Sequence, residues 1–149
     1  MKAKTLALPI LVPIFCFVCG DLSAQNEIKK EKWHWGSELK QDTSSGYVQT
    51  VKVDNILYIS GAVARDVTPE DIKRVYQALE RSLKAFGATF QNVVKENLYT
   101  TDMDAMKRYN DARKVFYKGD FPAATWTGVT RLFMADAKLE VELIAHLPK

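Results

Sequence analysis

Apolar residues recur along the chain with two different periods, and the changes between them mark the predicted elements. Alternating or β-branched stretches predict strands at residues 47–53, 55–60, 93–100, 125–133 and 139–145. Asp54 and Asn55 give a turn between the first two strands, which predicts a hairpin. Gly61 ends the second strand, and residues 62–67 form a loop or a short further strand.

Two stretches with helical spacing lie between these strands. The first has Thr68 as its capping residue and Pro69 at the first helical position, and it stops at Gly87. The second follows Asp102 and ends at Gly119, and its methionine and aromatic stripe is typical of a core, so we assign it no cofactor. The order ββαβαββ predicts an α+β fold, a mixed β-sheet with two helices packed on one face.

The last predicted strand has two unlike faces. Alternation places leucine and valine side chains on one face, and it places Glu140, Glu142 and Ile144 on the other. A face that mixes carboxylates with apolar side chains is too apolar for water and too polar for a closed core. We therefore expect an oligomer to cover it, with ligand-binding clefts between subunits.

Residues 1–24 are typical of a secretory signal peptide. Two lysines precede an almost wholly apolar run at residues 6–19, and Ala24 gives a small residue before the predicted cleavage point. We therefore expect export, to the periplasm or out of the cell, with no stable membrane span once the leader is removed. Retention of the segment as an anchor, and lipidation at Cys16 or Cys19, are the alternatives.

The remainder divides into an N-terminal arm, residues 25–45, and one domain, residues 46–149. The arm carries a cluster of lysines, which we interpret as a solvated tail, and we expect Trp33 and Trp35 to pack back on the domain. The 149 residues are 47% apolar and 26% charged, as in an ordinary globular protein. Because the formal charge is only +3, we expect no nucleic-acid partner.

The candidate chemistry is limited by what remains after the leader. Both cysteines lie in the leader, and His34 and His146 have no metal-ligand spacing from each other. The glycine-rich motifs that cradle dinucleotides or phosphates do not occur in the sequence. We therefore expect no metal and no cofactor, and we look for a site built from carboxylates, hydroxyls and amides.

Several short segments, in order, resemble one known family. They are Gly46-Tyr47-Val48-Gln49, Ile59-Ser60-Gly61, Asp102-Met103 followed by Asn110, and Phe121-Pro122-Ala123 running into residues 140–145. The chain resembles the reactive intermediate deaminase family, also known as the YjgF/UK114 or endoribonuclease L-PSP family. The resemblance implies the fold of the bacillus type of chorismate mutase, a homotrimer, and sites between adjacent subunits.

The resemblance also implies an activity. The best-known members hydrolyse 2-imino acids to 2-keto acids and ammonia, with an arginine after Pro-Ala gripping the substrate carboxylate. A glutamate of the last strand orients the water, and a tyrosine near the first strand completes the pocket. A protonated imine carbon is already electrophilic, so the protein needs only to hold the substrate, place one water and relay a proton.

Carried over position by position, the catalytic pair falls on Glu140 and Tyr47. The substrate-binding positions fall on a small loop, one helix and one strand: Ser60, Gly61, Asn110, Ala124, Thr125 and Trp126. Ala124 stands where the family has its arginine. A charged hydrogen bond to a carboxylate contributes about 1.5–3 kcal/mol, so its loss costs roughly one to two decades of affinity for an imino acid. Arg65 is a candidate replacement, whereas alternation puts Arg131 on the opposite face.

Each of these residues also has a purely structural interpretation. Glu140 could be a buried carboxylate satisfied by backbone amides, and Tyr47 a core aromatic with a bonded hydroxyl. Trp126 could fill the space of the absent arginine, and Asn110 could hold a neighbouring loop. The threonines could simply be exposed strand residues.

The sequence predicts an exported deaminase-like hydrolase that converts a C=N bond to a carbonyl compound and ammonia. Its substrate would lack a carboxylate, or have the carboxylate held by another group. The alternative is a non-catalytic trimer that binds a small molecule on the same fold. RNA cleavage ranks last, because the chain has neither a basic stripe nor a histidine placed for acid–base work.

Overall fold

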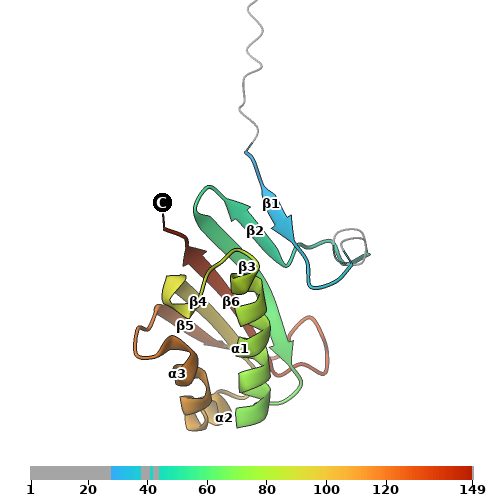
Figure 1. Cartoon of the computed structure of the whole chain (residues 1–149). Coiled ribbons are helices and arrows are strands. Elements are labelled where there is room, and N and C mark those ends of the chain that lie inside the picture. The colour runs from blue at the N-terminus through green and yellow to red at the C-terminus, as the bar shows by residue number, and fades with distance from the viewer. Residues whose placement is uncertain (1–27, 38–40, 42–43, 149) are drawn as a thin grey trace, which may run out of the picture.

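The computed structural model describes residues 28–37, 41 and 44–148. These residues form one six-stranded mixed sheet in the order β1-β2-β3-β6-β4-β5, with helices packed against it (Figure 1). The strands are β1 (Glu31–Trp33), β2 (Thr50–Val53), β3 (Ile56–Ala64), β4 (Val93–Thr100), β5 (Ala123–Gly128) and β6 (Leu139–His146). The helices are α1 (Pro69–Lys84), the 3-10 turn η2 (Phe90–Asn92), α2 (Met103–Arg108) and α3 (Asp111–Tyr117). Each neighbouring pair is antiparallel except β4 and β5, which are parallel.

Helix α1 begins where its capping residues predict. The Thr68 hydroxyl oxygen accepts a hydrogen bond from the Asp71 backbone N–H at 3.1 Å, and Pro69 occupies the first turn. Gly87 follows the helix with a φ of 70°, a conformation that suits glycine. The predicted start and stop of this helix are therefore confirmed.

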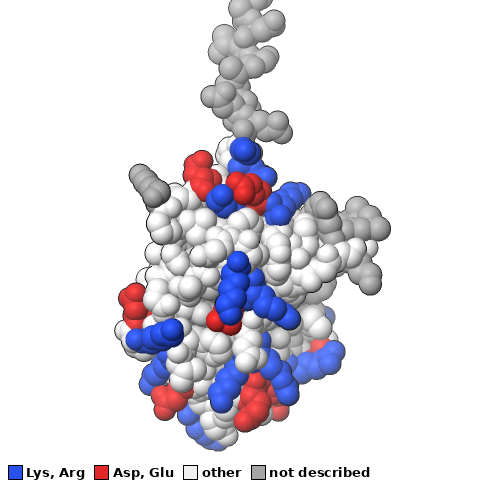
Figure 2. All heavy atoms as spheres, in the orientation of Figure 1, with Lys and Arg blue, Asp and Glu red and all other residues white. Residues whose placement is uncertain are grey.

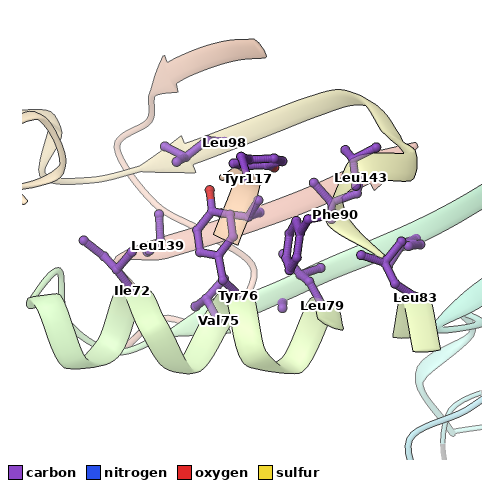
Figure 3. Packing of buried hydrophobic residues seen from close by; sticks show 14 of the residues in the cluster. Ile72, Val75, Tyr76, Leu79, Leu83, Phe90, Leu98, Tyr117, Leu139 and Leu143 are labelled. Carbon is purple, nitrogen blue, oxygen red and sulfur yellow. The ribbon is translucent and has the colours of Figure 1, made fainter. Parts of the chain in front are cut away.

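The core lies between α1 and the sheet. Figure 3 shows side chains of α1 pointing toward the strands, where Leu139 and Leu143 of β6 meet them. Leu139, Val141 and Leu143 are at most 2% exposed, whereas Glu140 and Glu142 between them are only half-buried. This confirms the predicted alternation of β6, with one face in the core and the other open.

The second predicted helix was wrong in one respect, because it is two helices. The chain leaves the helical conformation at Tyr109, whose φ is −104° and ψ is 16°, and α3 starts after Asn110. Asn110 makes no capping hydrogen bond with its side chain, so nothing at this residue explains the break.

Three strand limits also differ from prediction. β3 continues through Gly61 to Ala64 by means of a bulge between Ile59 and Ala62. β2 starts only at Thr50. β5 ends at Gly128, and residues 129–138 form a connection instead of more strand. This connection is required, because β4 lies between β5 and β6 in the sheet.

The N-terminal arm also contributes a strand that the sequence did not predict. β1 pairs with β2, and it extends the sheet at the end opposite β5. As expected, one tryptophan of the arm packs on the domain: Trp35 Nε1 donates to Ser82 Oγ of α1 at 3.3 Å, and the Arg81 guanidinium lies 5.8 Å from the Trp35 ring centroid.

The surface that carries α1 mixes basic and acidic side chains (Figure 2). Within the described part of the chain, no helix is both long and apolar enough to cross a bilayer. The same residues hold no group of three or more His, Cys, Asp or Glu side chains that could bind a metal ion. The predicted leader, residues 1–24, lies outside the described residues.

Candidate functional site

Two carboxylates of β6 lie on the open face of the sheet. Glu142 Oε1 accepts hydrogen bonds from Asn97 Nδ2 at 2.8 Å and from the Tyr99 hydroxyl at 3.2 Å, both on the neighbouring strand β4. Burial, and then the nearby Glu142 charge, raise the pKa of the Tyr99 hydroxyl, which therefore stays a proton donor. Two donors on one oxygen fix the orientation of Glu142 and leave its Oε2 available.

Glu140 lies against the bulge of β3. A Cβ atom added at Gly61 would overlap the Glu140 carboxylate. The carboxylate can therefore occupy this position only because residue 61 has no side chain. Burial, and secondarily the Glu142 charge, raise the pKa of Glu140 above that of an ordinary carboxyl. A half-buried carboxyl with a raised pKa is suited to accept a proton from water and to return it.

Substitution of Gly61 by alanine should therefore displace the Glu140 carboxylate and leave the fold intact. The added methyl meets the end of a flexible side chain, which can swing away at little cost. We expect the thermal midpoint to change by only a few degrees, while any activity that uses Glu140 falls at least tenfold. Gly128→Ala is the matched control, because a Cβ there meets nothing within 4 Å. An unchanged activity in Gly61→Ala would contradict this placement.

A shallow hollow of about 240 Å³ lies on the same open face. Its lining mixes polar and apolar residues: Val51, Tyr58, Ile59, Ser60, Lys95, Asn97, Glu142, Leu143 and Ile144. The Lys95 ammonium donates to Thr125 Oγ1 at 2.7 Å. The open face therefore combines fixed carboxylates, one ammonium and apolar wall residues.

A second polar cluster lies on the other side of the sheet, beneath the helices. Glu96 of β4 is fully buried, and its carboxylate accepts four donors: Arg113 Nε at 2.8 and 3.1 Å, the Tyr117 hydroxyl at 2.6 Å, the Tyr76 hydroxyl at 2.8 Å and Trp126 Nε1 at 3.3 Å. Burial raises the pKa of both tyrosines, and the Glu96 charge adds to this, so both remain donors.

Sequence reasoning missed this cluster. Arginine and glutamate are seldom fully buried, so an apolar stripe alone does not predict them. One signal was present: alternation along residues 93–100 puts Glu96 on the same face as Leu98, which is a core residue. A carboxylate at an inward strand position requires a partner in the core, and Arg113 provides it.

The structure separates the predicted site residues into two groups. Ser60, Gly61, Thr125 and Glu140 lie on or beside the open face, since Thr125 bonds to Lys95 there. Ala124 and Trp126 are paired in register with Glu96 and Leu98, so they lie on the helix-covered side of β5. Asn110 belongs to this second group, because it precedes α3. One chain alone does not bring the two groups together.

Tyr47 and Ser60 both make hydrogen bonds within the chain, and Tyr47 is not the core aromatic that its structural interpretation predicted. The Tyr47 side chain is 41% exposed, not in the core, and its hydroxyl accepts a hydrogen bond from Gln41 Nε2 at 3.0 Å. Ser60 Oγ donates to the Val48 carbonyl at 2.7 Å. This bond fixes the segment before β2 against β3, so the Ser60 hydroxyl serves structure as well as lining the hollow.

Arg65 and Arg131, which were considered as replacements for the family arginine at position 124, lie outside both groups of site residues. Arg65 forms an exposed ion pair with Asp136. Arg131 is exposed in the connection after β5.

The fold and these two groups define a class: a small α+β protein with carboxylates on the open sheet face and, among the described strands, a parallel strand at one edge. Comparison with known proteins identifies the family within this class. The family model described as Endoribonuclease L-PSP matches residues 38–147. The chain belongs to this family, as its resemblance predicted.

Individual relatives agree with this assignment. The chain is 33% identical over 108 residues to a mouse protein named 2-iminobutanoate/2-iminopropanoate deaminase, covering 66% of this chain and 79% of that protein. Among solved structures, yeast Mmf1 is 25% identical with a TM-score of 0.64, covering 70% of this chain and 89% of that one. A YjgF/YER057c/UK114 family member from Mycobacterium tuberculosis has a TM-score of 0.71 at 20% identity, covering 80% and 100%. The predicted mixed α+β fold is thereby confirmed.

Proposed function

We propose that this protein is an imine deaminase that hydrolyses a C=N bond of a small imine or enamine to a carbonyl compound and ammonia. The observation that carries the proposal is the placement of Glu140, whose carboxylate has a raised pKa on an otherwise open sheet face. The deaminase name of the mouse relative supports the same reaction class.

The reaction requires one water and one proton carrier. Glu140 takes a proton from the water as the water oxygen bonds to the protonated imine carbon and the C=N π electrons move to nitrogen. The same proton then passes to the nitrogen of the carbinolamine. The C–N bond breaks, ammonia leaves, the hydroxyl proton is released to solvent, and the carbonyl remains. Glu142, held by Asn97 and Tyr99, keeps the neighbouring charge fixed throughout.

We further propose that the site is completed between two copies of the chain in a homotrimer. Three observations support this: the two groups of site residues lie on opposite sides of the sheet, β5 is an edge strand, and the open face exposes Tyr58 and Val63 at 46% and 40%. A second copy that places its β5 edge on the open face would bring Ala124 and Trp126 to Glu140 and cover these apolar side chains.

Ala124 bears on the choice of substrate. With alanine at the position that the resemblance gives to the arginine, the substrate either has no carboxylate or has it held by another group.

The experiment is a panel of neutral imines and 2-imino acids, generated in the assay and presented to purified full-length protein. We expect ammonia and the carbonyl product to form in equal amounts, above the buffer rate. Saturable binding without turnover would support the non-catalytic alternative and overturn the deaminase.

We also propose that the protein is exported through the leader at residues 1–24. Two lysines before an apolar run, and a small residue at Ala24, support cleavage at that point. We expect mass spectrometry of the protein recovered from outside the cytoplasm to show Gln25 as the first residue. An intact Met1 or a lipid on Cys16 or Cys19 would contradict it.

A further inference from the structure

The guanidinium of Arg113 is the cation placed beside the Ala124 position. Arg113 is 6% exposed, and its Nε–H is held by both oxygens of Glu96. Aromatic rings surround it: the distances from Cζ to the ring centroids are 4.9 Å for Tyr117, 5.5 Å for Trp126 and 5.9 Å for Phe121. The carboxylate at one edge and the rings at its faces hold the guanidinium in one orientation.

Most donors of this guanidinium are unused. Its five N–H groups include four on the two Nη atoms, and in the described chain none of these four has a hydrogen-bond acceptor. Charged donors at this depth need an acceptor, from solvent or from a ligand. A carboxylate is the group that a pair of guanidinium N–H donors fits best.

The edge strand near the guanidinium carries a small side chain. Ala124 is the register partner of Glu96 on the edge strand β5, and its side chain is a single exposed methyl. Phe121, 51% exposed, covers the guanidinium from the preceding loop. One helical turn before Arg113, the side-chain Oδ1 of Asn110 is buried without a hydrogen-bond partner. Asn110 comes three residues before Arg113, and its oxygen has its acceptor positions unused.

We propose that Arg113 binds the carboxylate of a small 2-imino or 2-oxo acid, and so performs from α3 the function that Ala124 cannot. The inference rests on the proposed deaminase function and names its substrate class as anionic. Glu96 acts as a positioning residue, because its bond to Nε directs the two Nη groups away from the core. The Asn110 oxygen accepts the N–H of the substrate nitrogen.

The test measures binding of 2-oxobutanoate, the keto acid that hydrolysis of 2-iminobutanoate gives, by calorimetry on full-length protein. 2-Butanone is the matched neutral ligand. We expect Arg113→Lys to weaken 2-oxobutanoate binding about tenfold, because the ammonium lacks the two-pronged geometry, and to leave 2-butanone unaffected. In kinetics, KM for 2-iminobutanoate should rise while kcat stays within a few fold.

A double variant tests the same binding without leaving an unpaired buried charge that could unfold the protein. Glu96→Gln with Arg113→Met removes both charges together, and we expect it to bind 2-oxobutanoate about 10- to 100-fold more weakly. Adding Ala124→Arg to this background should recover most of the loss, whereas Ala124→Arg alone should gain little. The control is Arg74→Met, which removes an exposed cation of α1 paired with Asp71 and should leave 2-oxobutanoate binding unchanged.

Several results would overturn the proposal. They are unchanged 2-oxobutanoate binding in the Arg113 variants, a tenfold loss of that binding in Lys95→Met, which would place the anchor on the open face, or a large gain from Ala124→Arg alone. Failure of the deaminase function looks different: no imine would be hydrolysed by the unmodified protein, whatever binds. Turnover of neutral imines with unaltered 2-oxobutanoate binding in Arg113→Lys would retain the function and reject Arg113 as the anchor.

Discussion

Replacing Arg113 with methionine should lower the free energy of unfolding by about 3–5 kcal/mol, because the fully buried Glu96 then loses its only cationic partner among the described residues. A domain of this size is stable by only about 5–15 kcal/mol, so this is a large fraction of the total. Chemical denaturation of the unmodified and variant proteins measures the difference.

The double variant separates the charge effect from the packing effect. Glu96→Gln with Arg113→Met leaves an uncharged amide, whose oxygen at the Oε2 position still accepts from the Tyr76 and Tyr117 hydroxyls. We expect it to recover most of the stability that Arg113→Met loses, since removal of both charges together avoids an unpaired buried carboxylate. A double variant as unstable as the single one would show that packing of the arginine stem, not its charge, stabilises this cluster.

Replacing Glu140 with glutamine should lower imine turnover by about 100- to 10,000-fold, the range expected for loss of a proton carrier. The fold should survive. Because the folded state raises the pKa of Glu140, the ionised carboxylate disfavours folding at neutral pH, so the neutral glutamine should if anything stabilise the protein. Steady-state rates and thermal midpoints of the two proteins measure both effects.

The pH dependence gives the companion test. Turnover should rise with pH through the raised pKa of Glu140, since only the ionised form accepts a proton from water. Glu142→Gln removes the neighbouring negative charge, and the midpoint of the profile should move to lower pH. A midpoint that stays in place would show that another group carries the proton.

Patterning was sufficient for the parts of the fold that bury apolar side chains. The capping residues of α1 and the alternation of β6 each depend on neighbours in sequence, so Thr68 and Glu140 could be placed from the sequence. The break at Tyr109, the bulge at Gly61 and the end of β5 are not marked by the apolar pattern of the residues around them. A single sequence does not contain that information directly.

The same division applies to the site. The resemblance supplied Glu140 and the Ala124 position, but it supplied no reason to consider Arg113 or Glu96. These two are unusual core residues whose pairing becomes visible only when α3 lies on β4. The sequence favoured Arg65 as the replacement cation, whereas in the structure Arg65 pairs with Asp136 at the surface.

The central claim, that Glu140 of one copy and the β5 edge of another form each site, is tested most directly by mixing two inactive variants. Glu140→Gln lacks the proton carrier, and Ala124→Asp places a repulsive, exposed charge on the edge strand. Each should be inactive alone. If protomers exchange freely in a 1:1 mixture, about a quarter of the sites receive both intact halves, and the mixture should recover about a quarter of the unmodified activity. No recovery, with exchange confirmed by native mass spectrometry, would contradict a shared site.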